Sequence, residues 1–162
     1  MRTILVLMAL LLPAALLADD VSQYERDFAG ILAVDQDPDA AMRAIGLSDA
    51  GAKALIAYAG KEVAALNGLA HTQAVELCAV EAKSAALADK VVDNGRAYQA
   101  RRAETVGGLA KVLGEKDLAA FHAWTAGFNI HLDTSAPKPE DLIRSGALKA
   151  DVVKARACGG AQ

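Results

Sequence analysis

The sequence is poor in the residues that build β-sheets, cysteine clusters and aromatic cores. Aromatic residues make up only 4% of its 162 residues, and it has two cysteines, four prolines and three histidines. Alternating runs of β-branched residues, which a half-buried strand needs, are missing from the sequence. Alanine dominates the apolar residues instead. The composition therefore predicts an all-α fold whose core forms through many small contacts between close-packed helices.

Charge and hydropathy argue against two classes of partner. The net charge is only −3, so the chain has no electrostatic footprint for nucleic acid or anionic lipid. Its one dense basic spot, formed by Arg96, Arg101 and Arg102, is followed closely by Glu104 and is interpreted as a solvated helix face. Charged residues recur throughout the sequence after residue 18. We therefore expect no membrane span in the mature chain, because a spanning helix needs about 20 apolar residues.

The first eighteen residues have the layout of a secretory signal peptide. Arg2 supplies a positive start, residues 4–17 form an apolar run, and Ala18 precedes an acidic pair. The run is short for a membrane anchor, and the nearest cysteine that could carry a lipid is Cys78. The sequence therefore predicts a signal peptide over residues 1–18 that is cleaved after Ala18.

Export would leave residues 19–162 as the mature chain. This length is enough for one domain with a hydrophobic core, so a single helical domain is predicted. The loss of Arg2 changes the net charge from −3 to −4. The location is expected to be periplasmic or extracellular, and both are compartments in which disulfides persist.

Apolar residues at helical spacing cover most of the mature sequence. Asn67-Gly68 and Asn94-Gly95 tolerate the left-handed conformation found at helix C-termini and are expected to end helices. A continuous helix over about 69–113 is the alternative, because the apolar seam keeps nearly the same face across Asn94-Gly95. The pattern predicts an antiparallel bundle of four main helices with short flanking helices. The expected helices cover about 21–33, a short segment from Asp37 to Gly46, 48–66, 69–92, 96–113, 115–132 and, after a linker over 133–139, two short pieces within 139–157.

The two cysteines are expected to form a structural disulfide. In an oxidising compartment, two cysteines in one small domain usually pair. A bond between Cys78, in the middle of a helix, and Cys158, near the C-terminus, would pin the tail to the bundle. The loop of about 80 residues predicts a stabilisation of about 4–5 kcal/mol in the chain-entropy treatment. The alternatives are free or intermolecular thiols, whereas a redox-active pair would usually have Cys-X-X-Cys spacing.

The sequence assigns no catalytic residue, metal or cofactor. His71, His122 and His131 do not pair at the i, i+4 spacing of two ligands on one helix face, and His122 and His131 would point in nearly opposite directions on one helix. The Gly-x-Ser-x-Gly elbow and the glycine-rich phosphate loop are both missing. The remaining candidates are interpreted as solvated charges, namely Glu62, Glu76, Glu81 and Glu104.

Two helix starts align with each other at an offset of 66 residues. Each begins with a leucine, Leu47 or Leu113, and continues into an apolar face that ends in a large aromatic residue. The pair resembles the twin Leu-Thr-x-x-Gln helix starts of the Spy/CpxP-like periplasmic stress proteins, which are helical chaperones or metal-stress sensors. The likeness covers about a dozen residues in each segment, and the chain is not assigned to that family. The Thr position is held by Ser48 and Gly114, and the Gln position by Gly51 and Asp117.

These observations favour an exported, non-enzymatic helical protein that binds a partner, either an accessory factor or one that is chaperone-like or related to envelope stress. The alternative is a carrier of a small apolar ligand held between helices. Its lining would come from four aromatic residues, which also have the spacing of an ordinary core face: Tyr58, Phe121, Trp124 and Phe128. A third hypothesis is an enzyme that uses His131 with Asp133. The expected partner is therefore an unidentified protein or a small apolar molecule.

Overall fold

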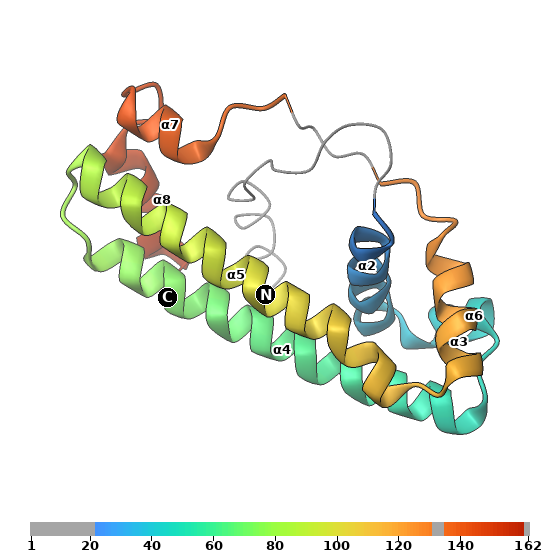
Figure 1. Ribbon diagram of the computed structural model, residues 1–162. Helices are drawn as coiled ribbons and strands as arrows, with labels where there is room; N and C mark the ends of the chain where they lie inside the picture. The colour runs from blue at the N-terminus through green and yellow to red at the C-terminus, as the bar shows by residue number, and fades with distance from the viewer. Residues whose placement is uncertain (1–21, 131–134, 161–162) are drawn as a thin grey trace. The chain divides into compact units, whose positions relative to one another are not determined.

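The computed structural model describes residues 22–130 and 135–160. These residues form seven helices and contain no strand, so the predicted all-α fold class is confirmed. The signal-peptide prediction over 1–18, and the hypothesis built on His131 and Asp133, lie outside the described residues. Figure 1 shows the helices, which are α2 (Gln23–Gln36), α3 (Pro38–Ile45), α4 (Asp49–Ala79), α5 (Ser84–Val112), α6 (Glu115–Thr125), α7 (Pro139–Arg144) and α8 (Ala150–Gly160).

Local capping signals fix four of the helix boundaries. Ser22 caps α2 by accepting a hydrogen bond from the Glu25 N–H. Asp37 caps α3 in the same way, and Gly46 ends that helix in the left-handed conformation, with φ of 72°. At the start of α4, the Ser48 hydroxyl accepts from the Gly51 N–H at 3.0 Å. The predicted short helix from Asp37 to Gly46 and the predicted cap at Ser48 are therefore confirmed.

The two Asn-Gly pairs do not end helices, so both of those predictions were wrong. Helix α4 runs through Asn67-Gly68, and α5 runs through Asn94-Gly95. The chain breaks at residues 80–83 instead, which also rules out the alternative of one helix over 69–113. The carbonyl of Val80, just beyond the end of α4, accepts a 2.7 Å hydrogen bond from the ammonium group of Lys154. This helix end is thus satisfied by a residue far along the chain, which no local pattern indicates.

Helix α6 is shorter than the predicted segment 115–132. It ends at Thr125, after which the N–H groups of Gly127 and Phe128 bond to carbonyls only three residues back. Gly127 favours this ending because glycine is a poor helix former. Phe128 consequently lies outside the helix.

The described residues divide into two compact units. The first, called here the α2–α6 unit, comprises 22–65 and 101–130, and the second, called the disulfide unit, comprises 66–100 and 135–160. Helices α4 and α5 contribute residues to both. The prediction of one domain over 19–162 stays a prediction.

The disulfide unit is held together by a bond between Cys78 and Cys158, whose Cα atoms are 4.9 Å apart. The bond joins α4 to α8, so the predicted pinning of the C-terminal tail is confirmed. Helices α7 and α8 cover the apolar end of α4 and α5 in this unit (Figure 1). The buried residues of the apolar cluster that these four helices share are Leu77, Leu87, Ala88, Val91, Ile143 and Ala157.

The α2–α6 unit has its own apolar core. Helix α2 packs against α3 and α6, and Gly30 of α2 lies directly against the side chains of Phe121 and Thr125 on α6. A Cβ atom at Gly30 would lie 2.8 Å from Cζ of Phe121 and closer still to Cγ2 of Thr125. The missing side chain therefore sets how closely the two helices approach. The fully buried large apolar residues of this core are Ile31, Val34, Leu55, Leu109 and Phe121.

Among the described helices, none is both long enough and apolar enough to cross a bilayer.

Candidate functional site: a buried polar cluster between α2 and α6

Four polar side chains from α2 and α6 meet around one carboxylate oxygen. Oδ1 of Asp27 lies 2.8 Å from Nε2 of Gln23, 2.8 Å from Oγ1 of Thr125 and 3.0 Å from Nδ1 of His122. Nε2 of Gln23 also donates to Oγ1 of Thr125 at 2.9 Å. Asp27 and Thr125 are buried, whereas the side chain of His122 is 39% exposed. The cluster thus joins an enclosed carboxylate to a histidine that reaches the surface.

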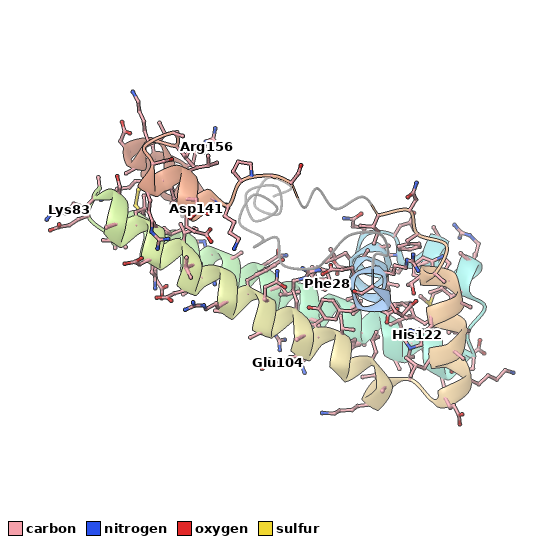
Figure 2. The ribbon with its side chains drawn as sticks, turned by 45° about the horizontal axis from the view of Figure 1, so that its top comes forward. Phe28, Lys83, Glu104, His122, Asp141 and Arg156 are labelled. Atoms are coloured by element: carbon pink, nitrogen blue, oxygen red, sulfur yellow. A yellow bond between two sulfur atoms is a disulfide. The ribbon has the colours of Figure 1, made fainter. Side chains whose placement is uncertain are left out.

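Helix periodicity brings these four residues together. Gln23 and Asp27 are four residues apart on α2, and His122 and Thr125 are three apart on α6, so each pair shares one helix face. Glycine at position 30 allows the two helices to approach closely next to the cluster. Figure 2 shows His122 on α6, in the same unit as Phe28 of α2.

The contact with Asp27 determines which nitrogen of the His122 ring carries a proton when the ring is neutral. A carboxylate is only an acceptor, so Nδ1 of His122 is the protonated nitrogen that donates to Asp27. In the neutral ring, Nε2 then carries the lone pair. The arrangement can therefore present a histidine base, nucleophile or hydrogen-bond acceptor whose orientation is fixed from behind by a buried carboxylate.

A second polar group links α2 to α5. The Arg102 guanidinium forms an ion pair with Glu25 and lies over two aromatic rings, 4.0 Å from the ring centre of Phe28 and 5.5 Å from that of Tyr24. The Arg102 side chain is 5% exposed. A buried arginine is tolerated here because a carboxylate and the faces of two rings surround its charge.

A third polar group links α4 to α5 in the same unit. Glu62, which is buried, pairs with Arg101 and accepts a 3.1 Å hydrogen bond from the Thr105 hydroxyl. The Tyr58 hydroxyl donates to the Thr105 carbonyl at 2.5 Å. Burial, with the nearby Glu62 carboxylate as a smaller cause, raises the pKa of Tyr58 above its usual value.

Two predictions about charged residues were therefore wrong. Arg101 and Arg102 were expected on a solvated face with Arg96, but only Arg96 is largely exposed, at 77%. Glu62 was expected to be a solvated charge and is buried. The reason is that neighbouring positions on α5 face different helices, so Arg101 meets α4 while Arg102 meets α2. The solvated interpretation holds for Glu76, Glu81 and Glu104, all of which are exposed.

The predicted ligand-facing aromatic residues differ in their surroundings. Phe121 is fully buried, whereas Tyr58, Trp124 and Phe128 are half-buried. The Trp124 ring lies 5.8 Å from that of Phe121 and 4.7 Å from that of Phe128, as centroid distances. Tyr58 packs on the same core, with its hydroxyl close to Gly108. The role of these residues in binding a ligand stays a prediction.

Metal ligands do not gather within the part of the chain that the structure describes. No group of three or more His, Cys, Asp or Glu side chains there has the arrangement of a metal site. His71 is exposed on α4, and both cysteines are joined in the disulfide.

The two helix starts that align in the sequence are in direct contact in the structure. The Ser48 N–H donates to Oδ1 of Asp117 at 3.0 Å, and the Ser48 hydroxyl donates to Oδ2 at 2.6 Å. Oδ2 also lies against Gly51. These hydrogen bonds from Ser48 lower the pKa of Asp117 below its usual value. The residues at the aligned positions 51 and 117 are thus neighbours.

Comparison of the chain with protein-family models, with curated proteins and with solved structures finds no match. The candidate site is consequently interpreted from its own geometry.

Proposed function

We propose that this chain is an exported, non-enzymatic helical protein that acts by binding a partner protein, as an accessory or chaperone-like factor of the cell envelope or the medium. The observation that carries the proposal is the Cys78–Cys158 disulfide. Disulfides persist mainly in oxidising compartments, and the sequence begins with a pattern typical of export. The disulfide and the N-terminal pattern are separate observations, and both support export.

The buried polar groups support a binding role because they hold helices in place. The Arg102–Glu25 pair joins α5 to α2, and the Glu62–Arg101 pair joins α5 to α4. Such pairs add orientational specificity to packed helices. Among the large apolar side chains that the structure describes, Val75 of α4 is the most exposed, at 46%, and offers a contact point for a partner.

Export is tested by expressing the full chain in a bacterium and measuring the intact mass of the product in each fraction. We expect a product in the periplasm or medium that lacks residues 1–18 and is lighter by about two protons than its reduced form. A full-length product confined to the reduced cytoplasm would contradict the proposal.

Binding is tested by placing a photo-crosslinking residue at Val75. Leu77 provides a matched control, since it lies two positions along the same helix and is only 5% exposed. We expect a discrete crosslinked adduct with another protein from Val75 and none from Leu77, in the exported fraction only. The absence of any adduct from Val75 and from the exposed Ile56 would count against a protein partner.

A small apolar ligand remains the second proposal, because Trp124 is half-buried beside Phe128. Trp124 is the chain's one tryptophan, so its fluorescence reports this position alone. Titration with a fatty acid should shift the emission maximum if the aromatic cluster lines a ligand site. An unchanged spectrum would remove the main support for a carrier.

A further inference from the structure

The Asp27–His122 pair points to a chemical reactivity that the proposed non-enzymatic binding function does not include, and its test is independent of the binding test. We infer that Nε2 of His122 is an acyl-acceptor site, which is modified by activated carboxylic esters and then releases the acyl group to water. Three observations carry this inference: the orientation of the ring, the enclosure of the carboxylate behind it, and the partial exposure of the ring itself.

The orientation of the ring favours attack by Nε2. The 3.0 Å contact between Nδ1 and Oδ1 of Asp27 places the ring proton on Nδ1. The lone pair is then on the nitrogen that does not face the carboxylate. An imidazole free in water divides its proton between both nitrogens, whereas this ring is held as the reactive tautomer.

The enclosure of Asp27 makes this orientation stable. Its carboxylate is 5% exposed, and the same oxygen also accepts from Gln23 and Thr125 at 2.8 Å. A carboxylate fixed by several donors holds its histidine and stabilises the positive charge that the ring acquires during attack. Thr125 cannot be the nucleophile, because it is fully buried and its hydroxyl is engaged with Asp27.

The exposure of His122 defines the class of acyl donor. The side chain is 39% exposed at the boundary of α6 and α2, with the ring of Phe121 at a centroid distance of 6.3 Å as its apolar neighbour. A small ester with a good leaving group can reach Nε2 there. An ester with a poor leaving group would need stabilisation of its tetrahedral oxyanion by placed donors, so the site is matched to activated esters such as phenyl esters.

The proposed reaction has two balanced steps. In the first, the Nε2 lone pair attacks the ester carbonyl carbon, the bond from that carbon to the leaving oxygen breaks, and a phenolate leaves with the electron pair. The ring becomes an acyl-imidazolium that keeps its proton on Nδ1, hydrogen-bonded to the Asp27 carboxylate. In the second, water adds to the acyl carbon and the bond to Nε2 breaks. The products are a carboxylic acid, a proton and the original neutral ring.

The test is the reaction of the oxidised full chain with p-nitrophenyl acetate, followed by release of nitrophenolate. His122→Asn is the decisive variant, because the asparagine amide can still donate to Asp27 but has no second nitrogen. We expect the second-order rate to fall on the order of tenfold in this variant, below the usual effect of acid–base groups because the ring works in contact with water. His71→Asn and His131→Asn are matched controls and should keep the rate of the unmodified chain.

Peptide mass mapping of the unmodified chain after a short reaction gives a readout that does not depend on any variant folding. The acetyl group should be found on the peptide that contains His122, and Asp27→Asn should reduce that occupancy several-fold while far-UV circular dichroism stays unchanged. Acetylation spread equally over His71, His122 and His131 would overturn the inference. An unchanged rate in His122→Asn would overturn it as well.

Discussion

Asp117 helps to cap a helix to which it does not belong. It lies in the first turn of α6, yet its two oxygens accept the N–H and the hydroxyl of Ser48 at the start of α4. Ser48 in turn accepts from the Gly51 N–H. The start of α4 is therefore fixed by a local hydrogen bond, from Gly51 to Ser48, and by tertiary hydrogen bonds from Ser48 to Asp117. Because the contact favours the ionised carboxylate, it links the stability of the fold to pH.

The first prediction concerns this linkage. The folded pKa of Asp117 is lowered, so the stabilisation is present above the unfolded pKa of about 3.9 and is lost as pH falls through the lower folded value. Asp117→Asn should lower the urea midpoint at pH 6, and this difference from the unmodified chain should shrink steadily below about pH 4. In a Ser48→Ala background the effect of the substitution should be smaller, because only the hydrogen bond from the backbone N–H of residue 48 to Asp117 remains. A difference that does not depend on pH would contradict the assignment.

Arg102 carries a buried charge that is contacted by a carboxylate and two aromatic rings. Its guanidinium meets Glu25 and the faces of Tyr24 and Phe28, all from α2. Arg96, six positions earlier on α5, is 77% exposed and lies 3.6 Å from Asp93. On the same helix, Arg102 is therefore buried, whereas Arg96 is largely exposed.

The second prediction compares these two arginines. Arg102→Ala should lower the free energy of unfolding by about 3 kcal/mol or more, because it leaves the Glu25 carboxylate unpaired beside the apolar rings. Arg96→Ala should change it by less than about 0.5 kcal/mol. Urea unfolding followed by circular dichroism measures both. Equal effects from the two substitutions would show that Arg102 is not buried as described.

At the scale of elements, α4 and α5 pair as antiparallel helices through polar contacts in each unit. In the disulfide unit, Gln73 donates to the Asn94 carbonyl at 2.8 Å, and Asn94 donates to the Gln73 carbonyl at 3.4 Å. Both side chains are buried. These reciprocal bonds occupy the amide of Asn94, which the sequence pattern had suggested for a helix end. Asn94 thus links α5 to α4 and does not end a helix.

The third prediction tests whether α4 is continuous through Gly68. A Cβ atom at this position would meet nothing within 4 Å, so Gly68→Ala should stabilise the protein by about 1 kcal/mol through helix propensity alone. If Gly68 ended a helix in the left-handed conformation, alanine would destabilise it instead. Gly46→Ala provides that contrast, because φ is 72° there, and it should cost about 1 kcal/mol. The sign of the shift in melting temperature separates the two cases.

Local chemistry accounts for much of what the sequence predicts about these elements. The Asp37-Pro38 start, the Gly46 end and the Ser48 cap follow from side-chain and backbone preferences within a few residues. The break at residues 80–83 could not be predicted in this way, because its distinguishing contact comes from Lys154. Tertiary contacts decide such boundaries, and local propensity is a weak guide to them.

The same distinction applies to the candidate site. Each half has a local signal in helix periodicity, Gln23 with Asp27 and His122 with Thr125. Their meeting depends on the packing of α2 against α6 across 95 residues of sequence between Asp27 and His122. Ligand spacing within one helix does not predict this site for that reason, whereas it favours residues that are close in sequence, such as His131 and Asp133.

At the scale of the whole molecule, the two units differ in the interactions that stabilise them. The bond lies entirely within the disulfide unit, whereas the buried ion pairs of Glu25 and Glu62 lie in the α2–α6 unit. One unit thus relies on a covalent link over an apolar cluster and the other on charged contacts between helices.

The fourth prediction follows from this division. Replacement of Cys78 and Cys158 by serine should lower stability by about 4.5 kcal/mol, from a closed loop of 80 residues. Hydrogen exchange should rise most at residues 84–100 and 150–160, while residues 23–36 on α2 change least. A loss of protection equal in both units would show that they unfold as one. The control is the unmodified chain after full reduction, which should match the serine variant.

The disulfide also determines whether the chain stays in one piece after a protease cuts its backbone. A protease that cuts anywhere between Cys78 and Cys158 opens the backbone but leaves two fragments joined through sulfur. The four-residue turn at 80–83 contains the exposed Lys83, and a cut after it would fall within that span. A nicked molecule would keep its mass on a non-reducing gel and separate only when reduced. Under the proposed export, the bond keeps the two fragments of a singly cut molecule together until a reductant breaks it.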